Sequence, residues 1–235
     1  MPALLSELIG TTLLILLGDG VVANVVLQRT KGHGGGWIVI TAGWSLAVFL
    51  GVLVSAAGSG AHLNPAVSMS LALAGKFDWN LVPGYCLAQM LGACLGAGLV
   101  WVQYADHFEA TEDGNAKLAV FCTGPAIRSW GLNLASEAIG TFILVFAALN
   151  ISSPTGGLGS LDALPIALVV LAIGLSLGGT TGYAINPARD LGPRLMHALL
   201  PISKKRDSDW SYAWIPVCGP LAGGALAALV FRAVQ

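Results

Sequence analysis

Charged side chains are scarce in this sequence. Asp, Glu, Lys and Arg together make up 10% of its 235 residues, whereas hydrophobic residues make up 55%. Soluble domains carry about 25% charged residues, so this composition indicates a chain that lies in a lipid bilayer. The formal net charge of −1 gives no indication of a nucleic-acid partner.

Motifs for chemistry are also lacking. The four cysteines are not spaced as a zinc site or as a redox pair. The sequence contains no nucleophile–base set, no phosphate-binding loop and no metal cluster. We therefore predict no metal, no cofactor and no enzymatic activity. The first apolar segment follows no basic region and is too long for the core of a signal peptide, so we expect it to remain as a membrane span.

Long apolar segments are what the sequence has in abundance. Each of them is close to the ~20 residues that a helix needs to cross a bilayer. The six segments are Leu4–Leu27, Trp37–Ala57, Leu81–Ala105, Asn133–Ile151, Ala163–Gly179 and Tyr212–Val234. Polar connections lie between them, and the longest of these, Asp106–Gly131, divides the chain near its middle.

One pattern, Gly-x-x-x-Asn-Pro-Ala, occurs twice, at Gly60–Ala66 and at Gly182–Ala188. Asn caps a helix N-terminus through its side-chain oxygen, and Pro fits the first helical position. Each copy therefore predicts an extended loop that turns into a helix. Only a short apolar run follows each copy, Val67–Ala74 or Leu191–Leu200. At about 1.5 Å per residue, such a run crosses roughly half of a ~30 Å hydrocarbon core.

The two halves of the chain share further features. The pattern Glu-x-Ile-Gly-Thr begins at Glu7 in the first span and at Glu137 in the fourth. Each half then continues as span, half-helix, span. Because each half has an odd number of spans, the second half enters the membrane from the opposite side. We therefore predict two inverted repeats, residues 1–110 and 127–235, with the functional site near the midplane where the half-helices meet.

Paired Asn-Pro-Ala motifs, six spans and a Glu at the head of each half resemble the aquaporin (major intrinsic protein) family over essentially the whole chain. The resemblance implies an all-α membrane protein, one channel domain over residues 1–235, with six transmembrane helices and two re-entrant half-helices. Asp190 after Arg189, a basic Arg194, and Pro220-Leu221 in the last span are similar to the glycerol-facilitator branch of that family.

The resemblance also implies a pore with a narrow filter. In this filter Arg189 would donate to hydroxyl groups, and Trp44 and Tyr183 would receive the CH edge of a polyol. Gly174 would leave room for that solute. Glycerol facilitators often have Phe where this chain has Tyr183, so the solute preference stays open.

Other residues are implied to line the pore or to support it. The amides of Asn64 and Asn186 would donate at its centre, and the two helix N-termini beside them would disfavour cations. The remaining lining residues belong to the two loops and helix starts: Gly60, Ala61, His62, Pro65, Ala66, Gly182, Ala184, Pro187 and Ala188. Structural braces are implied at Glu7, Glu137 and Asp190; proton relay is the alternative role for the two glutamates.

Together these residues predict a passive channel for glycerol, similar small uncharged solutes and water, which excludes ions and protons. A mainly water-selective pore is a second interpretation, against which Gly174 and Asp190 argue. Small uncharged acids and hydroxyketones are further candidate solutes. An ion-coupled secondary transporter is an alternative of another class, because inverted repeats and broken helices occur there too. Asp19, an acid inside the first span, could serve such coupling, face the channel or hydrogen-bond locally.

Localisation and assembly also follow from the resemblance. It implies a homotetramer in the plasma membrane, in contact with lipid, with several spans per chain and both termini in the cytoplasm. Lysine and arginine counting predicts the opposite orientation, because the side that would be cytoplasmic carries only Lys76 and Arg232. The other side carries Arg29, Lys31, Lys117, Arg128, Lys204, Lys205 and Arg206.

Overall fold

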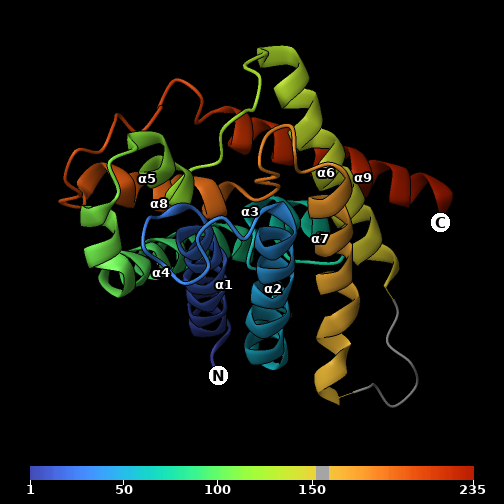
Figure 1. Ribbon diagram of the computed structural model, residues 1–235. Helices are drawn as coiled ribbons and strands as arrows, with labels where there is room; N and C mark the ends of the chain where they lie inside the picture. Colours follow the sequence, from blue (N-terminus) through green and yellow to red (C-terminus); the bar gives the residue numbers. More distant parts are fainter. Residues whose placement is uncertain (152–158) are drawn as a thin grey trace.

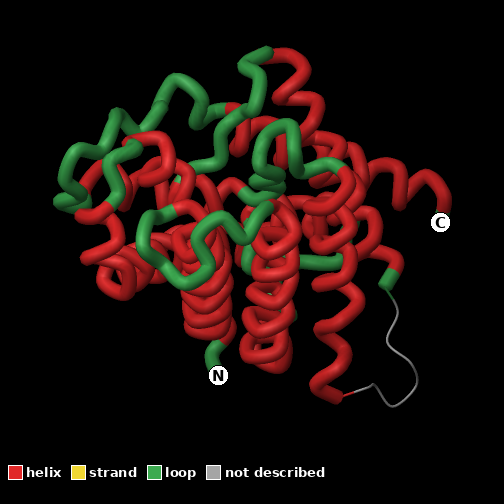
Figure 2. Tube along the Cα trace, in the orientation of Figure 1, coloured by secondary structure: helices red, strands yellow, loops and turns green. Residues whose placement is uncertain are grey.

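The computed structural model describes residues 1–151 and 159–235. Within these residues every regular element is a helix and none is a strand (Figure 2). The helices that are long and apolar enough to cross a membrane are α1 (Ala3–Val26), α2 (Trp37–Ser59), α4 (Val82–Ala110, preceded by the 3-10 helix η1, Trp79–Leu81), α6 (Trp130–Asn150) and α9 (Ile215–Val234). These helices confirm the predicted all-α membrane class.

The fifth predicted span, Ala163–Gly179, is shorter than expected. Helix α7 (Leu164–Ser176) has 13 residues, which is a length of about 20 Å. It stops just before Gly178 and Gly179, because adjacent glycines disfavour helix. The 3-10 helix η2 (Gly159–Ala163) precedes it, and the two helices together approach the ~30 Å thickness of a bilayer core.

Two short helices begin where the repeated motif predicts. Helix α3 (Pro65–Leu73) has 9 residues and α8 (Pro187–Leu199) has 13. The asparagine before each helix, Asn64 or Asn186, accepts a hydrogen bond from the backbone N–H two residues further on. Both helices therefore start for the local reason read from the sequence, a side-chain cap followed by proline.

The two halves of the chain interlock through these short helices. Helix α1 packs against α2 and α4, and α6 packs against α7 and α9. The short helix of each half lies against the last long helix of the other half, α3 against α9 and α8 against α4. Figure 1 shows α1, α2 and α7 standing next to one another, in agreement with the contacts of α2 with both neighbours.

Glycines permit the closest of these helix approaches. A Cβ at Gly92 would lie 2.5 Å from the carbonyl oxygen of Leu8, where α4 crosses α1. A Cβ at Gly223 would lie 2.0 Å from the carbonyl oxygen of Ala138, where α9 crosses α6. Backbones that approach this closely are typical of helix pairs in membranes. The small residues of the third and sixth predicted spans therefore serve packing within the chain.

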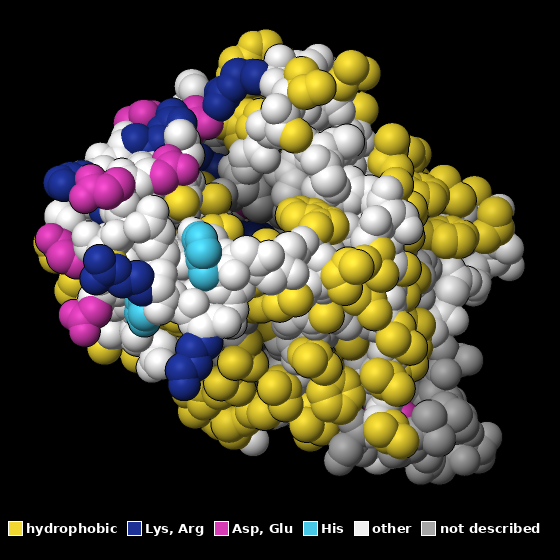
Figure 3. All heavy atoms as spheres, in the orientation of Figure 1, with side chains coloured by type: hydrophobic (Ala, Val, Ile, Leu, Met, Phe, Trp, Pro, Cys, Tyr) yellow, Lys and Arg dark blue, Asp and Glu magenta, His cyan; other side chains and the backbone are white. Residues whose placement is uncertain are grey.

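The connection Asp106–Gly131 contains more helix than its polar composition indicated. Helix α4 continues to Ala110, and α5 (Gly114–Phe121) follows, capped by Asp113, which accepts from the backbone N–H of Asn115. Charged side chains gather around this region at the upper left of Figure 3, whereas hydrophobic side chains cover the lower and right-hand parts of that face. Most of the connection Ser152–Leu161 lies outside the described residues.

Candidate functional site

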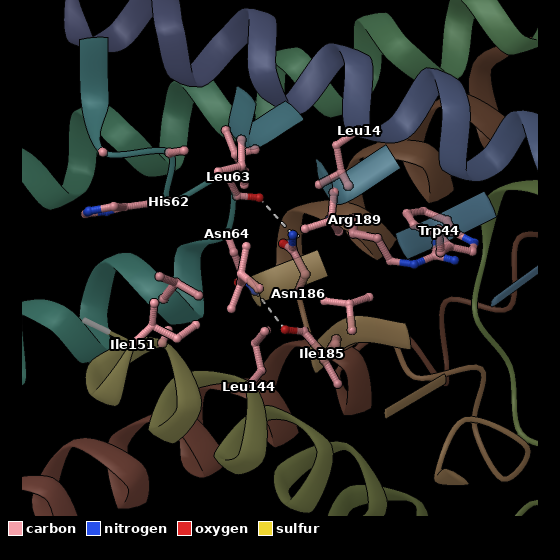
Figure 4. Close-up of a pocket in the computed structure, with 18 of the residues that line it drawn as sticks. Leu14, Trp44, His62, Leu63, Asn64, Leu144, Ile151, Ile185, Asn186 and Arg189 are labelled. Carbon is pink, nitrogen blue, oxygen red and sulfur yellow. Dashed lines mark hydrogen bonds between the residues drawn. The ribbon is translucent and has the colours of Figure 1, made fainter. Parts of the chain in front are cut away.

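Two asparagines from opposite halves of the chain meet between α3 and α8. The side-chain amide of Asn64 donates to the carbonyl oxygen of Ile185 at 2.8 Å, and that of Asn186 donates to the carbonyl oxygen of Leu63 at 2.8 Å (Figure 4). Each side-chain oxygen caps its own helix. Each amide nitrogen therefore retains one N–H for a ligand in the cavity that both asparagines line.

A buried carboxylate holds the loop that precedes α8. One oxygen of Glu137 accepts from the Thr181 hydroxyl at 2.6 Å and from the backbone N–H of Ala184 at 3.0 Å, and the other accepts from the N–H of Ile185 at 2.8 Å. In this loop Tyr183 has φ +36° and Ile185 has φ +43°. Non-glycine residues in this region cost about 1–3 kcal/mol each, so the loop needs partners that oppose the strain.

Glu7 makes the matching contacts before α3. It accepts from the backbone N–H groups of His62 at 2.9 Å and Leu63 at 2.8 Å, and from the hydroxyl of Ser59 at 2.6 Å. The side chain of Gln89 donates to the same carboxylate at 2.7 Å. With their hydrogen bonds directed to loop donors, both glutamates have the geometry of braces.

A cavity of about 270 Å³ lies beside the two asparagines. The predicted residues that line it are Trp44, Gly60, Ala61, His62, Asn64, Tyr183, Ala184, Asn186 and Arg189. Apolar side chains make up much of the remaining lining and include Leu14, Val52, Leu144 and Val170. A cavity lined by both donors and hydrocarbon suits a solute that has both hydroxyl groups and CH groups.

Arg189, Trp44 and Tyr183 lie together at this cavity. The guanidinium carbon of Arg189 lies 4.0 Å from the centroid of the Trp44 ring, a distance typical of a cation–π contact; Figure 4 shows the two side chains next to each other. The Arg189 side chain is 9% exposed. A donor group and an aromatic wall are thus presented at one place.

Gly174, the fourth predicted filter residue, does not line the cavity. A Cβ at this position would lie 2.9 Å from Cζ of Tyr183 and 2.9 Å from Cγ2 of Thr41. The Trp37 indole N–H donates to the Gly174 carbonyl oxygen at 2.9 Å and the Trp37 ring meets that of Tyr183 edge-on. The space that glycine provides is therefore occupied by the Tyr183 ring.

Other predicted lining residues also lie outside the cavity wall. Pro65, Ala66, Pro187 and Ala188 belong to the first turns of the short helices, and Gly182 is in the loop before α8; none of them lines the cavity. His62 lines it, and its ring Nδ1 is 3.0 Å from the Ser68 hydroxyl.

Asp190 lies behind the cavity and holds a second arginine. The Arg194 guanidinium donates to it twice, at 2.7 and 2.9 Å, and the Thr123 backbone N–H and hydroxyl donate at 2.8 and 2.5 Å. Arg194 also donates to the carbonyl oxygen of Ser208 at 2.7 Å. This network ties α8 to the connection between α5 and α6 and to the connection that follows α8.

The connection that follows α8 is held by charge as well. Arg128 forms an ion pair with Asp209. Partial burial alone would raise the pKa of the Asp209 carboxyl, but the hydrogen bonds from Arg128 and Ser211 outweigh burial and lower this pKa. Asp209 is therefore ionised at neutral pH and holds this connection through its ion pair with Arg128, while its backbone carbonyl accepts from Arg194 at 3.1 Å.

Several partners in the site were not identified from the sequence. Ser59, Gln89 and Thr181 complete the shells of the two glutamates. The signal available was weak, because polar residues in apolar spans need partners but their spacing does not reveal which. The sequence leaves three roles open for Asp19 and does not identify its partner; its carboxylate lies 3.6 Å from a nitrogen of Arg189.

Comparison of the sequence with known proteins gives matches over nearly the whole chain. The family described as "Major intrinsic protein" matches residues 1–231. A probable glycerol uptake facilitator protein of Thermotoga maritima is 57% identical over 232 residues, which cover 99% of this chain and 99% of that protein. A D/L-lactic acid transporter of Lactiplantibacillus plantarum is 39% identical over 230 residues, covering 96% of this chain and 94% of that protein.

Structure comparison agrees with the sequence matches. The X-ray structure of the aquaglyceroporin from Plasmodium falciparum superposes with a TM-score of 0.87 at 34% sequence identity. The superposition covers 99% of this chain and 95% of that chain. The predicted aquaporin-like fold is therefore confirmed.

Proposed function

The chain belongs to the major intrinsic protein family, and from this membership we propose that it is a passive membrane channel for glycerol, similar small uncharged solutes and water. Proteins of this family are channels or transporters, so the chain is a transport protein and not an enzyme. The finer proposal includes the exclusion of ions and protons, and one channel per chain built from the repeats 1–110 and 127–235.

The observation that carries this proposal is the mixed lining of the cavity. Amide N–H groups of Asn64 and Asn186 and the guanidinium of Arg189 line it together with apolar side chains. A solute that loses its hydration shell regains hydrogen bonds at these donors, while its CH groups meet the apolar side chains. The N-termini of α3 and α8 meet at the asparagines, and each carries about half a positive charge, which disfavours cations. Backbone carbonyls of the two loops are proposed as further acceptors.

Stopped-flow light scattering on proteoliposomes tests the proposal. We expect glycerol-driven reswelling faster than in protein-free vesicles, with a flux that rises linearly with the glycerol gradient. Water flux is expected to rise, while proton and ion leaks stay at the level of the empty vesicles. A saturable flux that accumulates solute against its gradient would contradict a passive channel and favour an ion-coupled transporter.

A second candidate solute is a small carboxylic acid in its uncharged form. The similarity to the D/L-lactic acid transporter favours it, and the donors at Arg189 and the two asparagines fit a carboxyl group as well as a hydroxyl group. In the same vesicles, lactic acid flux that follows the protonated fraction as pH falls supports this candidate. Flux that follows the anion instead would contradict it.

We propose the plasma membrane as the location, with both termini in the cytoplasm. Under this orientation, many of the basic residues on the outer side have partners within the chain. Lys117 donates to the carbonyl of Ser203, Lys204 pairs with Glu112, Arg128 pairs with Asp209, and Lys205 donates to carbonyls at the end of α8. These partners weaken the lysine and arginine count that predicts the reverse orientation. The contacts of Lys117, Arg128 and Lys205 give these residues structural roles independent of topology, whereas the exposed Lys204–Glu112 pair contributes little.

Orientation is testable with one cysteine introduced at either end of α4. Glu112→Cys and Asp78→Cys replace exposed residues, whereas Lys117 is fully buried and unsuitable for labelling. On intact cells an impermeant thiol reagent is expected to label the cysteine at 112 and spare that at 78. The unsubstituted chain, with its four native cysteines, is the background control. Labelling at 78 alone would establish the reverse orientation.

We also propose a homotetramer, which the family membership supports. Leucines at every fourth position of α4 point outward, at Leu87, Leu91, Leu95 and Leu99, and provide an apolar ridge for lipid or for a neighbouring copy. Crosslinking in native membranes is expected to give a ladder that ends at four copies. A ladder that ends at two copies at saturating crosslinker would contradict the tetramer.

A further inference from the structure

Asp19 is a buried acid inside a membrane-spanning helix, and its surroundings give it a specific partner. It lies in α1 with no exposed surface, and neither carboxylate oxygen has a hydrogen-bond partner among the described residues. Its Oδ1 lies 3.6 Å from Nη1 of Arg189, which also lacks a hydrogen-bond partner. Intramembrane acids are costly and are kept for a function, and in the described part of the chain the cavity arginine supplies the ion-pair partner of Asp19.

Asp190 cannot take this role, although it follows Arg189 in the sequence. Both of its oxygens accept from Arg194, and one also accepts from Thr123. Arg194 and Asp190 thus form one complete pair behind the cavity. Asp19 and Arg189 form the other, so that two buried arginines and two buried aspartates cancel in charge.

The position of Asp19 is set by the packing of α1 against Trp44. A Cβ at Gly18 would lie 2.2 Å from the Trp44 ring, so the absence of a side chain lets the ring lie directly on the helix. Asp19 is the next residue of α1. The guanidinium of Arg189 lies 4.0 Å from the Trp44 ring centroid and 3.6 Å from the Asp19 carboxylate, so this one group contacts both the ring and the acid.

We propose that Asp19 is a positioning residue of the filter. Its charge draws the Arg189 guanidinium back against the Trp44 ring and cancels the positive charge at the narrow point. The retracted guanidinium leaves width for a polyol, and the cancelled charge gives anions no attraction to the constriction. This inference rests on the proposed function and identifies a residue that determines how well the channel favours glycerol over water.

The ratio of glycerol flux to water flux tests the role, because a loss of correctly folded protein lowers both fluxes and leaves their ratio unchanged. Asp19→Asn keeps the shape and removes the charge, which frees the guanidinium to swing into the cavity. We expect the ratio to fall by about fivefold or more, and Asp19→Glu, which restores the charge, to recover most of the loss. Asp106→Asn makes the same chemical change at an exposed position of α4 and is expected to keep the wild-type ratio.

A folded Asp19→Asn variant with a ratio within about twofold of wild type would overturn the proposal. Wild-type vesicles without glycerol flux would instead refute the proposed function. If Asp19→Asn is too unstable to reconstitute, melting temperatures in detergent decide, since a buried charge without its partner is strongly destabilising. Arg189→Gln with Asp19→Asn is then expected to melt above either single variant. A double variant whose loss of stability equals or exceeds the sum of the two single losses would refute the pairing.

Discussion

Glu137→Gln is expected to lower both the stability of the protein and its glycerol flux. The carboxylate accepts three hydrogen bonds, from the Thr181 hydroxyl and from the N–H groups of Ala184 and Ile185. A glutamine keeps one acceptor oxygen and turns an N–H₂ group toward the remaining donor. A buried donor without an acceptor costs about 1–3 kcal/mol, and two residues of this loop have positive φ values that relax once the hold weakens.

The loss of flux is expected to be larger than the loss of folded protein. The loop that Glu137 holds contains Tyr183, and it presents the Ile185 carbonyl oxygen to Asn64. A shift of this loop therefore moves the cavity wall and breaks one of the two reciprocal asparagine contacts. We expect glycerol flux per reconstituted protein to fall by about tenfold or more, as measured by stopped-flow light scattering.

Glu112→Gln is the matched control for this change. Glu112 is an exposed residue whose side chain pairs with the equally exposed Lys204, and exposed pairs contribute little to stability. This variant is expected to keep both the melting temperature and the flux of the wild type. Equal behaviour of the two variants would show that Glu137 does not brace the loop.

The parts of this protein that could be predicted from sequence are those that depend on local physics. The starts of α3 and α8 follow from Asn64-Pro65 and Asn186-Pro187, because capping and proline geometry involve only a few neighbouring residues. The long helices follow from apolar length alone. The early end of α7 is not evident from the sequence, because Gly178 and Gly179 close a segment that is otherwise apolar, and apolar composition does not show where a helix breaks.

Contacts across the fold could not be predicted in the same way. The role of Asp19 depends on Gly18 and Trp44, which bring α1 and α2 together, and on α8, which brings Arg189 to the same place. Neither spacing nor composition encodes that meeting of three helices. Gly174 illustrates a different limit: a small residue predicts space, but only the fold shows that Tyr183 fills it.

Gly174→His is therefore expected to act through Tyr183. An added Cβ alone would lie 2.9 Å from the tyrosine Cζ and 3.1 Å from its hydroxyl oxygen, so an imidazole must displace the ring. Thr41 limits the room for the new side chain, because its Cγ2 would lie 2.9 Å from the added Cβ. The Tyr183 ring can instead move into the cavity that it lines. Overpacking of this kind costs about 1–3 kcal/mol, and the displaced ring narrows the path of the solute.

We expect Gly174→His to reduce glycerol flux by about tenfold or more while water flux falls less, because a narrower path still admits the smaller molecule. Gly179→Ala is the matched control, since a Cβ there would meet no atom within 4 Å. Adding Tyr183→Ala to Gly174→His removes the displaced ring and is expected to restore part of the glycerol flux. If Gly174→His keeps the wild-type ratio of glycerol to water flux at equal reconstituted protein, the Tyr183 ring does not set the width of the channel, and the filter must lie elsewhere along the cavity.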